Sequence, residues 1–400
     1  MIATFEPCAL KGTVQAPPSK SMAHRYLIGA ALSGEVCTLS GVDASQDILA
    51  TVDCLRALGA KVTVRGDEVT VDPEGFMEAE APVLDCRESG STLRFFIPLA
   101  LCLGRPVIFR GSERLLERPL SVYEDLCREK GFTFRKEADR VEVCGGLKSG
   151  TYALRGDISS QFITGMILAL VWRGEEAAIR IRPPFESGSY VDLTVSALRA
   201  FGADVAFADP YTVRVGPARL HGWSGRIEGD WSNAAFLDAF GHIGSEICVE
   251  GLDLNSLQGD RVYRDYFRQL SEGMPTLDIS DCPDLGPVLF ALAALQNGAV
   301  FTGTERLKVK ESDRGRAMDE ELQKLGGGLI FGDGTVTVPK QELHCRGTPL
   351  SGHNDHRIVM AMSVILSKTG GQIWGAEAVR KSYPGFFEDI RRLGAEVELK

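Results

Sequence analysis

Six segments of the chain share one pattern of hydrophobic and polar positions. In each segment an amphipathic helix ends in Leu-Gly or a close variant, and a short pair of alternating strands usually follows. Glycine at such an end supplies the left-handed backbone that stops a helix. The interval between successive glycines is about 70 residues except for one of 53, and the six are Gly59, Gly131, Gly202, Gly273, Gly326 and Gly394. This recurrence predicts six copies of one structural unit.

A second and more apolar helix precedes the amphipathic helix in each unit. These helices follow the motifs SKS, ESGST, ISSQ, DWSN, CPD and NDHR, and their bodies are apolar on nearly every side. A helix without a polar face is buried inside a domain. The pattern therefore predicts an α/β (α+β) fold of two similar domains, with helices inside and sheets outside.

The ends of the chain suggest how the two domains are connected. The last strand, in AEVELK, has no room to finish its unit, so the N-terminal strand in MIATFEP is expected to complete it. The predicted domains are residues 1–15 with 230–400, and residues 16–229. Two crossings between domains make a hinge, which we place near residues 12–20 and 226–232.

Composition excludes several classes of function. The net charge of −10 over 400 residues argues against a surface for nucleic acid or anionic membrane. No apolar run approaches the roughly 18–20 residues that span a bilayer, and the N-terminus lacks the apolar core of a signal peptide. Ten cysteines are scattered without a C-x-x-C pair, several of them in apolar helices. Reduced thiols in a cytoplasmic protein are the expected state.

Basic residues gather where the buried helices begin. Because the first N–H groups of a helix attract anions, several such ends facing one cleft would form an anion trap in an acidic protein. Arginine also offers a fork that fits carboxylate and phosphate, so the pattern favours small ligands that carry both groups. The basic residues are Lys20, Arg25, Arg94 and Arg357 at or near helix starts, and Arg114, Arg118, Lys308, Lys310, Arg314 and Lys381 in adjoining loops.

Each of these motifs also has a purely structural interpretation. The serines of SKS and GDISSQF can be plain helix caps, and KVKESDR can be a solvated charge run with Lys308 and Lys310 on one strand face. Asp284 can be either a proton acceptor or a cap. His353 and His356 have the spacing of a metal pair but no third ligand at suitable spacing, so we expect no metal.

Together the motifs resemble those of the 5-enolpyruvylshikimate-3-phosphate synthase family. The matching segments are PPSKSMAHR, ESGSTLRF, ERLLERP, GDISSQF, PDLGPVLFALAAL, KVKESDR, NDHR and RKSYPGFFEDI, in family order across essentially the whole chain. The resemblance implies two domains, each of three βαβαββ units in an inside-out barrel, that close about a hinge. It also implies transfer of the enolpyruvyl group of phosphoenolpyruvate to the 5-hydroxyl of shikimate 3-phosphate, with release of phosphate.

The resemblance further implies roles for individual residues. The catalytic residues would be Lys20, Asp284, Glu311 and His356. Shikimate 3-phosphate would contact Lys20, Ser21, Arg25, Ser159, Ser160, Gln161, Ser187, Tyr190, Asp284 and Lys310, mainly in the first domain. Phosphoenolpyruvate would contact Lys20, Gly90, Arg114, Gln161, Arg314, Arg357 and Lys381, mainly on the side of the second domain.

The chain also departs from the family pattern in places. Glu88 stands where many members have asparagine, and Phe95 follows Arg94 where many have proline. The resemblance implies no metal or organic cofactor, a monomer, and small-molecule substrates as the partners. Two alternatives are an enolpyruvyl transferase that acts on UDP-N-acetylglucosamine, and a non-catalytic phospho-ligand binding protein on the same scaffold.

Overall fold

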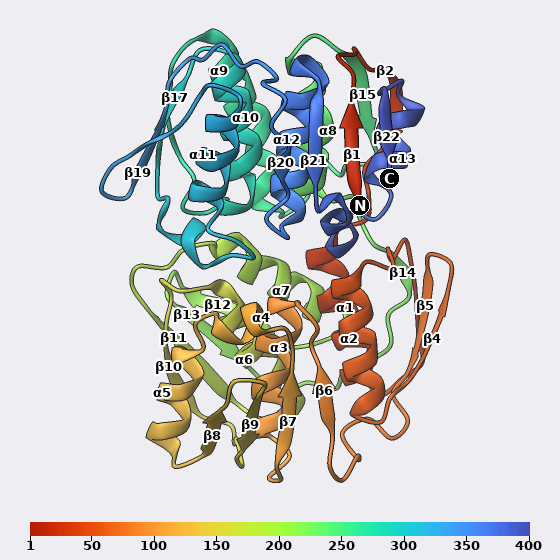
Figure 1. The fold of residues 1–400 in the computed structure, drawn as a ribbon. Coiled ribbons are helices and arrows are strands. Elements are labelled where there is room, and N and C mark those ends of the chain that lie inside the picture. Colours follow the sequence, from red (N-terminus) through yellow and green to blue (C-terminus); the bar gives the residue numbers. More distant parts are fainter. The chain divides into compact units, whose positions relative to one another are not determined.

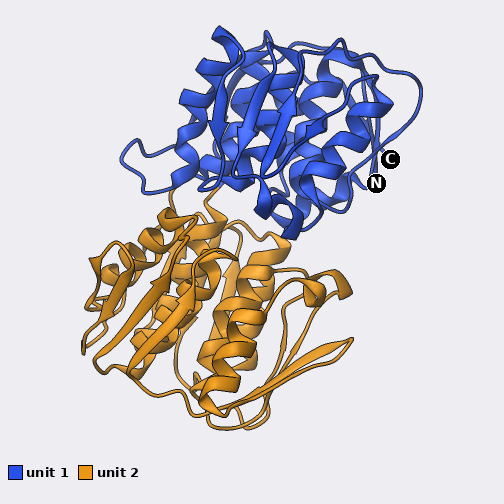
Figure 2. Cartoon of the chain, turned by 90° about the vertical axis from the view of Figure 1, so that its left-hand side faces the viewer, with its two compact units in different colours: residues 1–17, 229–400 blue, residues 18–228 orange.

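The computed structural model describes residues 1–400, which form two compact units. Unit 1 comprises residues 1–17 and 229–400, and unit 2 comprises residues 18–228 (Figure 2). These limits lie within two residues of the domain boundaries predicted from the sequence. None of the helices combines the length and the apolar character that crossing a membrane requires.

Unit 2 contains three four-stranded sheets, each with two main helices (Figure 1). The first group is β14 (Gly225–Arg226), β3 (Cys37–Ser40), β5 (Glu68–Asp72) and β4 (Lys61–Arg65), with α1 (Lys20–Leu32) and α2 (Gln46–Ala57). The second is β6 (Val83–Asp85), β7 (Val107–Arg110), β9 (Arg140–Cys144) and β8 (Thr133–Lys136), with α3 (Gly90–Leu101), the short α4 (Glu113–Glu117) and α5 (Ser121–Lys130). The third is β10 (Thr151–Arg155), β11 (Ala177–Arg182), β13 (Thr212–Val215) and β12 (Val205–Asp209), with α6 (Ser160–Arg173) and α7 (Gly188–Ala200).

Unit 1 contains two more sheets of this kind and a third with only two strands. The four-stranded sheets are β16 (Thr276–Asp278), β17 (Ala299–Thr302), β19 (Thr335–Val338) and β18 (Ile330–Phe331), and β20 (Leu350–Ser351), β21 (Gly371–Trp374), β1 (Ile2–Phe5) and β22 (Val397–Leu399). Their helices are α10 (Gly286–Leu295), α11 (Arg314–Lys324), α12 (His356–Thr369) and α13 (Phe386–Arg392). The two-stranded sheet pairs β15 (Glu246–Glu250) with β2 (Lys11–Gln15) beside α8 (Trp231–His242) and α9 (Tyr263–Glu272). Short 3₁₀ helices are η1 (Gly259–Val262), η2 (Pro283–Leu285), η3 (Glu305–Val309) and η4 (Ala376–Lys381).

All five four-stranded sheets have the same topology. In each sheet the first and second strands run parallel. The third strand is antiparallel to the second, and the fourth is antiparallel to the third. In the last of them β1, from the N-terminus, pairs with both β21 and β22 near the C-terminus. Only one strand, β22, follows Gly394, and the N-terminal strand β1 serves as its antiparallel partner.

The most apolar helices lie in the interior, as the sequence pattern predicts. α10 is buried from Gly286 through Ala294, and α6 is buried over most of its length. α3 and α6 pack closely because Gly165 has no side chain: a Cβ there would lie 2.3 Å from the carbonyl oxygen of Arg94. Sheet strands alternate between buried and exposed residues, so their outer faces meet solvent.

One predicted strand pair does not form. The amphipathic helix α9 ends at Gly273 and leads directly into β16, which belongs to the next sheet. This is the interval of 53 residues, which is too short for a further hairpin. Gly273 itself is extended at φ 173°, whereas the other five glycines have the positive φ that the pattern predicts. Strand β15 is left at the edge of its sheet.

The chain crosses between the units twice, at residues 17–18 and 228–229. Next to these crossings, the amide of Ser19 donates to the carbonyl of Glu228 at 2.8 Å within unit 2, and the amide of Asp230 donates to the carbonyl of Pro17 at 2.7 Å within unit 1. The two connecting segments are therefore hydrogen-bonded to one another on either side of the crossing.

Candidate active site

In unit 1, the starts of three helices bring charged side chains together around Asp284. This residue lies in η2, directly before α10, and its Oδ1 accepts a hydrogen bond from Nη1 of Arg314 at 2.6 Å. The same oxygen lies 3.0 Å from Nζ of Lys310, and Oδ2 accepts from Arg357 at 3.3 Å. Asp284 therefore faces three cations. The cap interpretation is wrong, since α10 has no side-chain cap.

The charges of this cluster shift the pKa values of its members. Burial opposes ionisation of Asp284, but Arg357, Lys310 and Arg314 outweigh it and hold the pKa of that carboxyl well below its usual range. Burial lowers the pKa of Lys310 to about 8, against the attraction of Asp284. Lys310 therefore loses its charge at mildly alkaline pH.

Arg314, the first residue of α11, is completely buried and fully paired with carboxylates. Its Nε donates to Oδ2 of Asp355 at 2.9 Å, and its Nη2 donates to Oε2 of Glu311 at 2.7 Å. Burial would lower the pKa of Arg314, but Asp355, Glu311 and Asp284 together raise it above its ordinary value. Asp355 also caps α12 by accepting from the amide of Arg357, so one carboxylate fixes the starts of two helices.

The turn before α12 has a strained backbone. His353 and Asn354 both have left-handed φ values, 48° and 51°, which residues other than glycine seldom adopt. The carbonyl of Asn354 accepts a hydrogen bond from Nζ of the buried Lys381 at 2.5 Å. His356 is the first residue of α12, is buried, and lies with Nδ1 3.7 Å from Asp355. The turn thus contains His353 and the carbonyl partner of Lys381, and it leads directly into His356.

In unit 2, the start of α1 places Lys20, Ser21 and Arg25 together. Of the two serines in SKS that could cap this helix, Ser19 is the N-cap and accepts from the amide of Met22. Nζ of Lys20 forms an ion pair with Asp47 at the start of α2, at 2.7 Å. The sequence interpretation missed Asp47, although its place in the first turn of a predicted helix was a signal.

Arg25 is buried and hydrogen-bonded to neighbouring parts of unit 2. Its guanidinium donates to the carbonyl of Ser21, to that of Tyr190 and to Oγ1 of Thr194, at 2.6 to 2.9 Å. The ring of Phe95 lies beneath it, 5.3 Å from the ring centre, which gives this departure from the family pattern a structural role. Burial lowers the pKa of Arg25 to about 10.

Gln161 connects the starts of α6 and α3. Its Oε1 accepts from Arg94 at 2.7 Å and its Nε2 donates to Oγ of Ser91 at 2.9 Å. Ser159 caps α6 by accepting from the amide of Gln161, and Ser160 is buried beside it. The cap interpretation therefore holds for Ser159, at a helix start whose first N–H groups have no partners within the helix.

Ser187 has an unusual backbone at the start of α7. Its φ is 55°, its side chain is buried, and it makes no capping bond to its own helix. Such strain in a non-glycine residue is typical of functional sites. Tyr190 follows one turn later and is partly buried.

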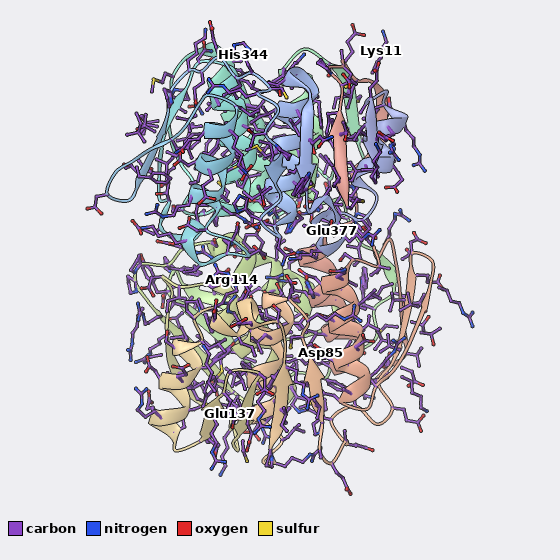
Figure 3. All side chains as sticks on the ribbon, viewed as in Figure 1. Lys11, Asp85, Arg114, Glu137, His344 and Glu377 are labelled. Carbon is purple, nitrogen blue, oxygen red and sulfur yellow. The ribbon has the colours of Figure 1, made fainter.

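Gly90, the first residue of α3, lies against Arg118 rather than Arg114. A Cβ on Gly90 would lie 2.8 Å from Nη1 of Arg118, whose side chain is buried. Arg114, on the short helix α4 and labelled in Figure 3, is 45% exposed and lies 3.7 Å from Glu117. The sequence interpretation left Arg118 among the adjoining loop residues.

Two further sequence interpretations need correction. Lys308 and Lys310 do not share a strand face, because the segment forms the 3₁₀ helix η3; Lys308 is exposed and paired with Glu305, whereas Lys310 turns inward to Asp284. His353 and His356 also face different neighbours. Their spacing is that of one helix face, but the helix begins only at His356.

His353 does meet carboxylates, from a helix far away in the sequence. Its Nε2 lies 2.6 Å from Glu321 and 3.9 Å from Glu320, both on α11, and the three groups are close enough to hold a cation. However, both oxygens of Glu321 already face Nζ of Lys324, at 2.8 and 2.9 Å. That ammonium supplies the positive charge a metal would bring.

Comparisons with known proteins agree with this chemistry. The family model for EPSP synthase (3-phosphoshikimate 1-carboxyvinyltransferase) matches residues 6–390. The 3-phosphoshikimate 1-carboxyvinyltransferases of Clostridium kluyveri and Clostridium acetobutylicum are 38% and 35% identical, covering 99% and 98% of this chain and 98% and 97% of theirs.

Solved structures show the same fold. The EPSP synthase of Acinetobacter baumannii matches with a TM-score of 0.79 at 24% identity, covering 99% of both chains. The enolpyruvyl transferase NikO of Streptomyces tendae matches with a TM-score of 0.76 at 15% identity, covering 99% of this chain and 98% of that one. With full-length relatives at this identity, the chain belongs to the EPSP synthase (3-phosphoshikimate 1-carboxyvinyltransferase) family, whose enzymes transfer the enolpyruvyl group of phosphoenolpyruvate to shikimate 3-phosphate.

Proposed function

We propose that the cation cluster of unit 1 binds phosphoenolpyruvate and that the helix starts of unit 2 bind shikimate 3-phosphate. Arg314, Arg357 and Lys381 are buried cations at helix ends, which suits an anion with a carboxylate and a phosphate. From unit 2 we assign Arg118, in place of Arg114, to the same substrate, since its guanidinium lies over Gly90 at the start of α3. Lys20 and Gln161 complete this set.

The shikimate 3-phosphate set follows the motifs of unit 2. Ser21 and Arg25 are assigned to the carboxylate, and Ser159, Ser160 and Ser187 to the 3-phosphate. The support is that the two groups of residues lie at the starts of α1, α6 and α7, where backbone N–H groups have no partner within the helix. Gln161 and Tyr190 are assigned to the ring.

Asp284 is the proposed acceptor of the 5-hydroxyl proton. In the absence of substrate its pKa is low because Arg357, Lys310 and Arg314 together outweigh the effect of burial. When phosphoenolpyruvate binds, its anionic groups take up the charge of these arginines, and the pKa of Asp284 rises toward the range of a useful base. Substrate binding would in this way activate the base only when the electrophile is in place.

The chemistry then proceeds by addition and elimination. The 5-oxygen forms a bond to C2 of phosphoenolpyruvate while C3 gains a proton, which gives a tetrahedral adduct. Collapse of the adduct breaks the bond from C2 to the phosphate oxygen, releases phosphate and returns a proton from C3. Glu311, 2.7 Å from Arg314, is assigned to the proton at C3, with His356 beside the pyruvyl group and Lys310 against the acceptor hydroxyl. The cations that stabilise the developing charge are side chains, so the scheme uses neither a metal nor an organic cofactor.

Both substrates must meet, so we propose that the two units close about the segments near residues 12–20 and 226–232. Closure would also exclude water from the charged adduct. Small-angle scattering with shikimate 3-phosphate and an anionic phosphoenolpyruvate mimic should show a smaller radius of gyration; an unchanged radius would contradict closure.

A monomer is the proposed working state, and reduced thiols in all ten cysteines suit a cytoplasmic location.

The observation that carries the proposal is the convergence of Arg314, Lys310 and Arg357 on Asp284. Asp284→Asn keeps the shape but removes the base, so kcat should fall about 10²-fold or more. Phosphoenolpyruvate affinity should be kept or improved, because a competing carboxylate is gone. A variant with normal kcat would exclude Asp284 as the base. Phosphate release with UDP-N-acetylglucosamine as acceptor, measured in parallel, tests the other transferase activity.

A further inference from the structure

Glu321 is a buried carboxylate outside the residues assigned to either substrate, in the second half of α11. It is seven residues, or about two turns, from Arg314 on the same helix. Its side chain is only 1% exposed, and it accepts hydrogen bonds from three different places. These are Nε2 of His353 at 2.6 Å, the amide of Ser351 at 2.8 Å, and Nζ of Lys324 at 2.8 and 2.9 Å.

Two of these donors belong to the strained turn before α12. The bonds from Ser351 and His353 hold residues 351–353, which lead into the left-handed pair His353 and Asn354. A conformation of this kind persists only when the surrounding structure holds it in place. From α11, Glu321 holds the first part of this turn, at Ser351 and His353, and Arg314 holds its last residue, Asp355. The hydroxyl of Ser351 adds a local bond from the amide of His353.

The same turn determines where three substrate-facing cations lie. The carbonyl of Asn354 accepts from Lys381, and the carboxylate of Asp355 accepts from Nε of Arg314. Asp355 also caps the helix that presents Arg357. A shift of the turn would therefore move all three cations together, whereas a change at any one of them would leave the other two in place.

We propose that Glu321, through its hydrogen bond with His353, is a positioning residue that sets the phosphoenolpyruvate clamp formed by Arg314, Arg357 and Lys381. This inference rests on the assignment of that clamp in the proposed function. Neither Glu321 nor His353 touches the substrate. They act on the spacing of the cations, and a misplacement of about 1 Å in such a site can cost as much as 100-fold in rate.

The test is the steady-state kinetics of the full-length enzyme with each substrate varied in turn. Glu321→Gln should raise the KM for phosphoenolpyruvate about tenfold, with the KM for shikimate 3-phosphate unchanged. A purely structural role would instead reduce the active fraction, which lowers kcat and leaves both KM values as they are. That result would overturn the proposal.

Glu320→Gln is the matched control. Glu320 is the next residue, its side chain is 61% exposed, and it lies 3.9 Å from the same imidazole nitrogen. Its substitution should leave both KM values within about twofold of the native enzyme. An equal effect of the two substitutions would indicate a general field of negative charge rather than a specific hydrogen bond, and would contradict the proposal.

A second pair of variants keeps the test valid if Glu321→Gln does not fold. His353→Gln retains a donor near the position of Nε2, whereas His353→Phe fills the space without one, and both carry the same backbone strain. The KM for phosphoenolpyruvate should rise with Phe and recover with Gln. If both variants match the native enzyme, the hydrogen bond has no positioning role.

Two more measurements separate other causes. Arg357→Lys should raise the KM for phosphoenolpyruvate by itself, and an unchanged KM would contradict the assignment of the clamp. If the KM rises with Arg357→Lys but not with Glu321→Gln, the clamp stands and only the positioning role of Glu321 is excluded. Treatment of the native enzyme with a chelator should leave the KM unchanged. A rise upon chelation would show that Glu320, Glu321 and His353 hold a metal, and would replace the hydrogen-bond interpretation.

Discussion

Lys310 lies with its Nζ 3.0 Å from Oδ1 of Asp284, and this ion pair is partly buried, with further cations around it. Arg306 and Arg314 oppose the charge of Lys310, while Asp284 and Glu311 favour it, and burial has the largest effect. The result is an ammonium group with a pKa of about 8, where an exposed lysine has about 10.5. The pair therefore loses its attraction within the range of mildly alkaline buffers.

This shift predicts how activity depends on pH. Lys310 has a pKa of about 8, so its hold on Asp284 and on the substrate is complete only well below pH 8, is halved near pH 8 and is lost as the pH rises further. The profile of kcat/KM for phosphoenolpyruvate should fall on the alkaline side with a midpoint near 8. Lys310→Arg stays charged and should move this limb to higher pH; an unchanged limb would assign it to another group.

Arg118 and Arg114 give a direct comparison of two neighbouring cations. Arg118 is buried against Gly90, whereas Arg114 is 45% exposed beside Glu117. Arg118→Lys should raise the KM for phosphoenolpyruvate about tenfold or more, because lysine cannot supply a two-pronged contact. Arg114→Lys is the control and should change it by less than about threefold. The opposite order would restore the original assignment of Arg114.

Gly165 predicts a large effect on stability away from the site. A Cβ at this position would lie 2.3 Å from the carbonyl oxygen of Arg94 and 2.5 Å from the hydroxyl of Tyr123, which forces α3 and α6 apart. Gly165→Ala should lower the free energy of unfolding by about 1–3 kcal/mol in urea titrations. Gly241→Ala, in a helix where the nearest atom would lie 3.7 Å away, should not destabilise the protein.

The missing hairpin predicts a local difference in amide exchange. The amide of Glu246 donates to the carbonyl of Leu10, directly before the neighbouring strand β2, and by the alternation of a parallel ladder the amides of Ile247 and Val249 face the open edge. These two amides should exchange at least about tenfold faster than that of Cys248, measured by hydrogen exchange and NMR. Equal protection would mean that the edge of β15 is covered in solution.

The sequence by itself determined most of the helices and strands and, through the family motifs, the reaction. The Leu-Gly endings specify where helices stop, and fully apolar helices have to be interior, because both properties depend on local backbone preference and on burial. The motifs also placed Lys20, Asp284 and Arg357 at helix starts. The pattern also predicted a strand pair after Gly273, which the structure does not form.

Only the tertiary structure decided which side chains meet. Arg118 rather than Arg114 lies over Gly90, Lys308 and Lys310 face in opposite directions, and Asp47 reaches Lys20 from another helix. Glu321 and His353 are 32 residues apart and carry no shared motif. Charged side chains are long and pair across elements, so their partners depend on how helices pack. That packing is set by distant apolar contacts, which no local pattern of residues records.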